Sequence, residues 1–331
     1  MPDLRAPLKI GANLWNQYTD WPAFLDGMLR AEDLGYDSLF TWDHLYPIIG
    51  SPVGPALEAY TAMAAVAAQT KRPLIGHLVG ANTFRNPALL AKMVTTIDHI
   101  SGGRAALGIG AAWMEPEHTA FGLEYGDRPG TRLQWLAQAL PIIRGMLDGS
   151  RPSSPPGSRY TVSSVRNDPP PLQRRVPILI GGSGPKVTLR LVAEYADMNN
   201  LGGPIDALRR SEAILVEHCA AIGRDEKEIE RTVELQRVTV RDTRAAALAL
   251  DAEILGRNGG AQVDEVRPGS GTAPADRVIA GNPDEVYEQL APFVQAGYRH
   301  LICGFPWPYD EETMRRIATE VRPRLEALIA S

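Results

Sequence analysis

The chain has 331 residues, of which 44% are hydrophobic and 22% charged, and its formal net charge is −5. It contains no basic run, which argues against nucleic acid as a partner, and no apolar stretch suited to a signal peptide or a bilayer span, so we expect a soluble, cytoplasmic protein without a membrane partner. Cys219 and Cys303 lie far apart and form no CxxC pair, as is typical of free thiols in a reducing compartment.

Strand-like apolar runs alternate with helical patterns along almost the whole chain. In chain order, strands are expected at 9–15, 36–43, 73–80, 104–110, 176–182, 196–201, 231–240 and 299–305. Helices are expected to follow them at 21–34, 57–69, 87–100, 132–147 and 185–195, then up to 222, from 243, and at 311–328. One extra helix is expected at 283–296, before the last strand.

This alternation predicts the fold class. Gly35 and Gly297 each end a predicted helix and are followed by Tyr and an apolar strand, the usual cap before a parallel strand. Eight strand-helix units with right-handed crossovers predict a (β/α)₈ TIM barrel with insertions at the C-terminal ends of strands. We expect a single domain over 1–331; a doubly wound open sheet is the alternative. Two long segments, at 149–175 and 256–277, are interpreted as functional or mobile insertion loops.

A cluster of small residues joins the predicted strand at 176–182 to the next helix. Gly181, Gly182, Ser183 and Gly184 match neither a Walker loop nor a G-x-G-x-x-G fingerprint. Glycines allow a tight turn, and free N–H groups at a helix N-terminus attract an anion. A phosphate-binding loop and a plain tight turn before a Pro-initiated helix both remain open from these residues.

Polar side chains follow other predicted strands, at the end of the barrel where catalytic residues collect. Asp43 either caps a turn or serves the site, and His44 is either a hydrogen-bonded rim residue or a functional one. Glu115 and Glu117 are interpreted as a solvated turn, because their i, i+2 spacing does not bring them together. The six histidines include no H-x-H or H-E-x-x-H motif, so no metal site is expected.

Five motifs occur in one order along the chain: TWDHL, LVGANTFRNPALLAKMVTTIDHISGGRAALGIGAAW, PEHTAFG, RNDPPPLQRRVPILIGGSGPK and YADMNN. This order resembles the bacterial luciferase-like monooxygenase superfamily nearly from end to end, with 82–113 as its most specific block. Within the superfamily the chain is most similar to the branch of F420-dependent oxidoreductases. FMN-using monooxygenases share much of the same pattern.

The resemblance implies a barrel, a homodimer and a deazaflavin, coenzyme F420, or alternatively FMN, lying across the strand ends. It also implies that the glycine loop receives the cofactor phosphate, and that Leu78 and Val79 form a bulge with a non-prolyl cis peptide behind the ring. The implied cofactor contacts are Asp43, His44, Leu78, Val79, Gly110, Ala111, Ala112, Gly181, Gly182, Ser183 and Gly184.

The implied chemistry is hydride transfer between F420 and a small organic substrate, with His44 as the proton donor or acceptor. Trp15, Trp42 and Trp113 form either an apolar substrate pocket or ordinary rim packing. Glu115 takes part only if its loop folds inward. The absence of a basic cluster, with cations dispersed at Lys71, Arg72 and Arg85, favours a neutral or weakly polar substrate. An FMN-dependent monooxygenase and a non-catalytic flavin-binding protein are the alternatives.

Overall fold

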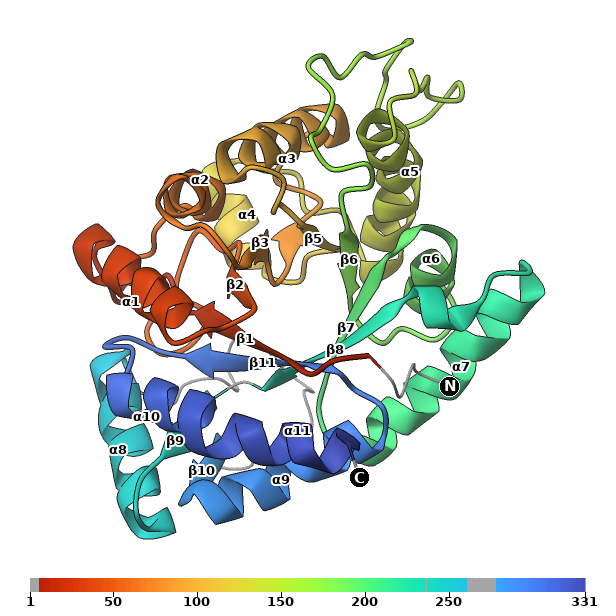
Figure 1. The fold of residues 1–331 in the computed structure, drawn as a ribbon. Helices are drawn as coiled ribbons and strands as arrows, with labels where there is room; N and C mark the ends of the chain where they lie inside the picture. The colour runs from red at the N-terminus through yellow and green to blue at the C-terminus, as the bar shows by residue number, and fades with distance from the viewer. Residues whose placement is uncertain (1–5, 236, 261–277, 331) are drawn as a thin grey trace.

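The computed structural model describes residues 6–235, 237–260 and 278–330, and parallel strands form its centre (Figure 1). The sheet has the order β3-β2-β1-β11-β8-β7-β6-β5-β4. Its strands are β1 (Lys9–Leu14), β2 (Ser38–Thr41), β3 (Leu74–His77), β4 (Gly80–Ala81), β5 (Leu107–Gly110), β6 (Ile178–Gly181), β7 (Met198–Gly202), β8 (Glu230–Leu235) and β11 (His300–Phe305).

The two ends of this sheet meet. β3 pairs with β2 and its continuation β4 pairs with β5, while a parallel bridge joins Ile75 to Ala105. β3 and β4 therefore occupy one strand position of a closed barrel, interrupted by a cis peptide bond between Leu78 and Val79. The predicted TIM barrel is confirmed, and the strand expected at 73–80 is found as these two short segments.

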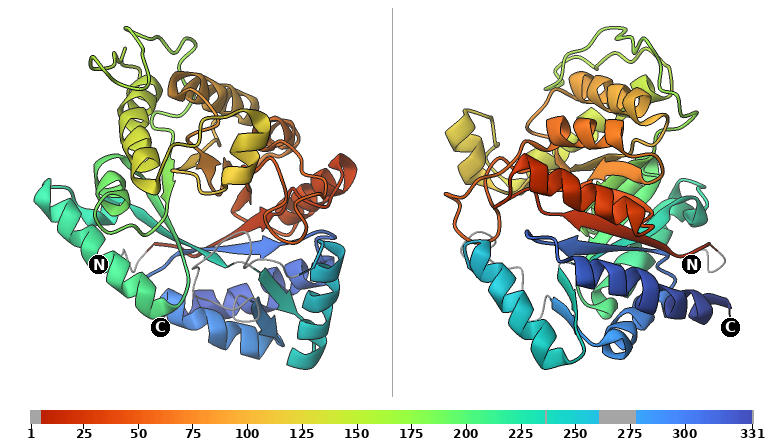
Figure 2. Two further views of the ribbon diagram at one scale, coloured as in Figure 1. Left: turned by 180° about the vertical axis from the view of Figure 1, so that it is seen from behind. Right: turned by 60° about the vertical axis from the view of Figure 1, so that its left-hand side comes forward.

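Helices lie outside the strands in both views of Figure 2. They are α1 (Trp21–Asp33), α2 (Ala59–Gln69), α3 (Pro87–Ser101), α4 (Glu115–Phe121), α5 (Pro129–Leu147), α6 (Thr188–Tyr195), α7 (Ile205–Ala221), α8 (Arg244–Arg257), α9 (Pro283–Gln295), α10 (Glu311–Arg316) and α11 (Arg322–Ala330), with a π-helical stretch (Ile317–Val321) before α11 and a 3₁₀ turn (Glu226–Glu228) before β8. α1, α3 and α9 begin alike: an Asp or Asn side chain accepts first-turn N–H groups, and proline follows. Over the described residues, none of these helices has the length and apolarity needed to cross a membrane.

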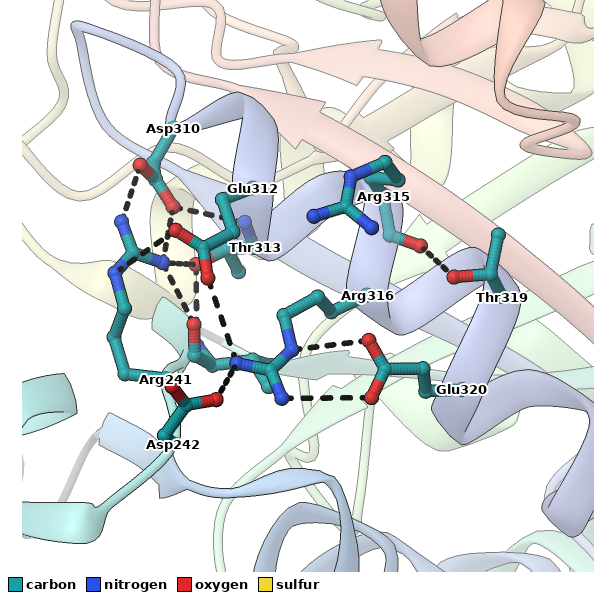
Figure 3. A network of polar contacts seen from close by, with 10 residues as sticks. Arg241, Asp242, Asp310, Glu312, Thr313, Arg315, Arg316, Thr319 and Glu320 are labelled. Atoms are coloured by element: carbon teal, nitrogen blue, oxygen red, sulfur yellow. Dashed lines mark hydrogen bonds and ion pairs between the residues drawn. The ribbon is translucent and has the colours of Figure 1, made fainter.

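The prediction of one continuous strand at 231–240 is wrong. It comprises β8 and a separate β9 (Arg237–Val240), which leaves the barrel and pairs with β10 (Val278–Gly281), a strand that the sequence analysis missed. Figure 3 shows how this appendage is fixed: Arg241 donates to both carboxylate oxygens of Asp310, at 2.9 and 2.7 Å, and Thr313 Oγ1 accepts from the Val240 amide.

The two predicted insertions differ in what the structure describes. Residues 149–175 form an irregular segment that is anchored on α3, where Asp98 accepts the amides of Leu172 and Gln173 at 2.7 and 3.1 Å. Most of the segment 256–277 lies outside the described residues. The single-domain organisation stays a prediction.

The barrel lumen is filled at mid-height by apolar side chains from opposite strands. Phe40, Leu179, Met198 and Ile302, from β2, β6, β7 and β11, pack together in one cluster with Leu78. Because side chains alternate along a strand, residues two positions from these also face the lumen. This register decides which residues line the mouth of the barrel.

One stability effect is predicted at the seam of the barrel, where β3 and β4 meet β5. A Cβ atom added to Gly108 on β5 would lie 1.7 Å from the carbonyl oxygen of His77, so the backbone of the seam must shift. We expect Gly108→Ala to lower the free energy of unfolding by about 3 kcal/mol in urea denaturation. Gly130→Ala, on the exposed first turn of α5 where an added Cβ meets nothing within 4 Å, should be neutral or stabilising by up to about 1 kcal/mol. Equal effects of the two substitutions would contradict the seam geometry.

Candidate active site

His44 lies just beyond β2 and is held by a buried carboxylate. Its Nδ1 is 2.9 Å from Oε1 of Glu117, and Oε2 of the same side chain accepts the Leu45 amide at 2.9 Å. The Glu117 side chain is 1% exposed and that of His44 is 14% exposed. Because an ionised carboxylate only accepts hydrogen bonds, Nδ1 carries the proton, and Nε2 is the ring nitrogen left to exchange a proton with another group.

Glu117 is positioned by α4, a short helix that was not predicted. Pro116 stands in its first turn and Gly122, at φ +67°, caps its end. Buried His118 ties α4 to the loop after β4, since its Nε2 lies 2.6 Å from Thr83 Oγ1. The interpretation of a solvated turn is therefore wrong for Glu117, whereas Glu115 is exposed and does not fold inward. The Pro and Gly at the two ends of EPEHTAFG were the available signal for this helix.

Asp43 is buried beside His44 and points to Arg85. Arg85 donates to both oxygens of Asp43, at 2.7 and 3.0 Å, and the Ala81 amide donates to Oδ2 at 3.0 Å. The second Arg85 partner is Glu58, at 2.6 Å. This bidentate pair joins the ends of β2 and β4. It also fixes the direction in which the chain continues from Asp43 to His44.

Behind this pair, three side chains form a column. The Arg85 guanidinium lies 4.1 Å from the centre of the Tyr60 ring, and the His77 ring stacks on Tyr60 with the centroids 3.8 Å apart. Burial lowers the pKa of His77 to about 4, although the Asp43 anion acts in the opposite direction. His77 is therefore neutral at physiological pH and supports the site by packing.

The residues at the ends of β5 and β6 suit a planar group and an anion. A Cβ on Gly110 would lie 2.9 Å from Val79 Cγ2, and one on Gly181 would lie 3.0 Å from both Val79 γ-carbons, so Val79 occupies the room that these glycines leave. Ala112 adopts φ +67° and Gly182 φ +115°. The cis peptide before Val79 is the one that the resemblance implied.

The glycine loop ends at a helix without a side-chain cap. Gly182 and Ser183 are exposed, and α6 begins at Thr188 after a turn, rather than at Pro185 as predicted. The N-cap residue Val187 provides no side-chain hydrogen bond to the first turn. A helix start without a side-chain cap, preceded by exposed glycines, fits a phosphate group, so the residues present are compatible with a phosphate-bearing cofactor.

The predicted tryptophans are placed differently from one another. Trp15 and Trp42 are buried and pack together with their ring centroids 4.5 Å apart, beside Ile49 and Leu255. Trp113 is half-buried, and its ring meets the imidazole of His44 edge-on at 5.3 Å. Packing at the barrel rim thus explains most of the contacts of Trp15 and Trp42. Trp113, in contrast, lies beside the imidazole ring of His44.

Comparison with known proteins gives the family. Residues 8–300 match the family model described as luciferase-like monooxygenase. The chain is 30% identical to the F420-dependent glucose-6-phosphate dehydrogenase of Microbacterium testaceum (strain StLB037), over 98% of this chain and 99% of that one. The chain belongs to the luciferase-like monooxygenase family.

Solved structures share the fold of this family member. An F420-dependent secondary alcohol dehydrogenase in complex with an F420-acetone adduct has a TM-score of 0.80 at 20% identity, covering 95% of this chain and 98% of that one. The oxygenating constituent of 3,6-diketocamphane monooxygenase from Pseudomonas putida, in complex with FMN, has a TM-score of 0.71 at 19% identity, covering 96% and 99%. At these identities the likeness concerns the barrel alone.

The column behind the site predicts a pH dependence of stability. His77 has a folded-state pKa of about 4, below the roughly 6.5 of an unfolded histidine, so the unfolded chain binds a proton that the folded chain does not. This contribution to stability is complete above about pH 6.5 and is lost as the pH falls towards 4. We expect His77→Phe, which keeps the stack on Tyr60, to reduce the loss of unfolding free energy between pH 7 and 5 by about 2 kcal/mol in urea titrations.

His99→Phe is the matched control, because His99 is exposed at the end of α3. An unchanged pH dependence in His77→Phe would show that His77 is not buried as a neutral ring.

Proposed function

We propose that this protein is an F420-dependent oxidoreductase that transfers hydride between coenzyme F420 and a small uncharged organic molecule, with His44 exchanging the proton. The observation that carries the proposal is the buried Glu117 carboxylate on Nδ1 of His44, whose side chain is 14% exposed at the mouth of the barrel. A histidine that only packs at the rim of the barrel would not require a buried carboxylate on Nδ1. Relatives and structural neighbours that are F420-dependent by name support the cofactor.

The cofactor would be held by residues from three neighbouring strand ends. The exposed loop from Gly181 to Gly184 and the uncapped start of α6 would bind its phosphate, and Ala111, Ala112 and Val79 would face its ring. Bound F420 supplies a ring carbon that accepts or gives a hydride. The protein has to orient the substrate and manage one proton.

His44 and Glu117 account for that proton. With Nδ1–H directed at Glu117, the Nε2 lone pair accepts the proton of a substrate hydroxyl when the substrate is oxidised, and the imidazolium returns it in the reverse direction. Glu117 stabilises the imidazolium and holds the ring orientation. Asp43 does not exchange the proton itself, because its carboxylate already accepts hydrogen bonds from Arg85 and from the Ala81 amide.

Charge near the strand ends favours an uncharged substrate. Arg85 is committed to Asp43 and Glu58. Lys71 and Arg72 lie in the loop before β3, at the opposite end of the barrel from the strand ends, where their amides donate to Glu32 at 2.7 Å. None of these three cations is available to bind a substrate phosphate, although the curated relative acts on glucose 6-phosphate by name.

FMN is the second cofactor candidate, since an FMN-bound monooxygenase shares the fold. The whole-length relative named for F420 outweighs this likeness. A non-catalytic flavin-binding protein would not require the buried carboxylate on His44. The homodimer and the cytoplasmic location remain predictions of the resemblance and of the sequence.

The first test of this proposal replaces the proton-exchanging ring. His44→Asn keeps a hydrogen-bonding side chain but cannot ionise near pH 7, so single-turnover hydride transfer with bound F420 should slow by about 10² to 10⁴. F420 affinity, measured by fluorescence titration, should change little. A rate loss below about threefold across the pH range would remove His44 from proton transfer.

Glu117→Gln tests whether the pair acts as a unit. The amide cannot stabilise an imidazolium and allows the other tautomer, so the rate should fall by about 10² or more while the barrel stays folded. The double variant with His44→Asn should be no slower than His44→Asn alone. Additive losses would mean that Glu117 acts independently of His44.

The glycine loop makes a separate prediction about binding. Gly182 has φ +115°, so Gly182→Leu strains the loop and places a side chain where the phosphate is expected. We expect F420 affinity to fall at least tenfold without loss of the folded barrel. Gly203→Leu is the control, because Gly203 also has positive φ, at +110°, and an added Cβ meets nothing within 4 Å. Equal F420 affinities of both variants would exclude this loop as the phosphate site.

A further inference from the structure

The chain just beyond β5 contains a residue in a strained backbone conformation. Ala112 adopts φ +67°, in the left-handed region that residues with a Cβ rarely enter. Such a conformation costs free energy and persists only where the surrounding structure enforces it, and strained residues of this kind collect at functional sites. Because Ala112 directly precedes Trp113, this turn sets where the Trp113 ring lies.

Two side chains hold the backbone at this turn. Arg132 Nε donates to the carbonyl oxygen of Ala112 at 3.3 Å, and the Tyr125 hydroxyl donates to the carbonyl oxygen of Trp113 at 2.7 Å. Arg132 belongs to α5, and Tyr125 lies in the connection between α4 and α5. Two successive carbonyl groups are therefore fixed by side chains that follow them by 12 and 20 residues in the chain.

The same two side chains also hold each other. The guanidinium carbon of Arg132 lies 3.8 Å from the centre of the Tyr125 ring, and Arg132 is 5% exposed. A planar guanidinium that stacks on an aromatic ring is kept in one orientation. The Tyr125 ring also lies 4.9 Å from the ring of His118, which belongs to α4. Tyr125 and Arg132, here called the clamp, therefore connect the turn at Ala112 to α4.

Trp113 is the residue that the clamp presents to the proton-exchanging imidazole. Its half-buried ring lies 5.3 Å from that of His44, with the two planes 65° apart. The hydrogen bond from Nδ1 to Glu117 fixes one atom of the imidazole, but it leaves the ring free to rotate about that bond. An aromatic ring packed edge-to-face on the imidazole restricts this rotation. Glu117 and Trp113 together therefore fix the direction of Nε2.

Building on the proposed function, we propose that Tyr125 and Arg132 are positioning residues for the proton exchange at His44. They hold Ala112 in its left-handed turn, and this turn places the Trp113 ring against His44. The clamp takes no part in the bond changes, because the proton passes to and from Nε2. Its effect on the rate comes through geometry, since misplacing a reacting group by about 1 Å can slow a reaction by about 10².

NMR spectroscopy of the full-length protein tests the clamp without relying on turnover. The ring signals of His44 are assigned by their loss in His44→Asn, and those of Trp113 by their loss in Trp113→Phe. Nuclear Overhauser cross-peaks should join the two rings in the wild type. They should be lost in Arg132→Lys, which keeps the charge but not the planar stack. They should be weakened in Tyr125→Phe, which removes the hydroxyl donor and keeps the ring.

A second arginine–tyrosine pair provides the matched controls. The Arg324 guanidinium carbon lies 4.8 Å from the centre of the Tyr287 ring, and Tyr287 belongs to α9. Tyr287→Phe and Arg324→Lys should leave the cross-peaks unchanged. Thermal unfolding curves show whether each variant is folded. If Arg132→Lys does not fold, Tyr125→Phe alone decides the outcome.

Single-turnover hydride transfer connects this geometry to the reaction. Propan-2-ol, cyclohexanol and D-glucose serve as probe alcohols for the F420-loaded protein. Tyr125→Phe should slow the transfer by about tenfold while F420 affinity stays unchanged. Because the clamp acts through the Trp113 ring, the double variant of Tyr125→Phe and Trp113→Ala should be no slower than Trp113→Ala alone.

The outcomes separate this inference from the proposed function. If the wild type binds and reduces F420 but the clamp variants keep both the cross-peaks and the rate, the clamp is wrong and the proposed function stands. Lost cross-peaks with an unchanged rate, or a slower rate with the cross-peaks retained, would also overturn the clamp. Failure of the wild type to bind F420, or to reduce it with any of the three alcohols, would overturn the proposed function and this inference with it.

Discussion

The buried pair between Asp43 and Arg85 is the interaction on which the rest of the site depends. Asp43 receives two guanidinium bonds and the Ala81 amide, so it fastens the end of β2 to β4 across the interrupted strand. Removing one partner of such a pair leaves an uncompensated charge and typically costs about 3 to 5 kcal/mol. Because His44 is the next residue in the chain, the direction of its side chain follows from this pair, and α4 then closes over it with Glu117.

The barrel is predictable because its sequence pattern is repeated many times. Each strand is buried on both faces and reads as a short apolar run, and each helix carries its own cap signals, such as Asn86-Pro87 and Asn282-Pro283. The break between β8 and β9 is not predictable in the same way. The run from Arg231 to Val240 keeps one continuous strand pattern, and only tertiary contacts such as that of Arg241 with Asp310 draw its second half out of the barrel.

The sequence predicts those site residues that directly follow the end of a strand. His44 and the loop at Gly181 follow strand ends, and this places them at the mouth of any parallel barrel. Glu117 is hydrogen-bonded to His44, which lies 73 residues away along the chain. A polar residue in a short helix or in an alternating strand gives no local sign of such a partner.

Two carboxylates, Glu117 and Glu234, lie near the mouth of the barrel in different surroundings. Glu117 is buried and accepts hydrogen bonds from an imidazole and an amide. In the proposed mechanism its charge orients the His44 ring and stabilises the protonated form of that ring. Glu234 is half-buried, and its partners include Asn13 Nδ2 and Trp42 Nε1, which donate to Oε1 at 3.4 and 3.3 Å. Because Glu117 belongs to α4, the proposed proton exchange at His44 depends on a short helix outside the barrel strands.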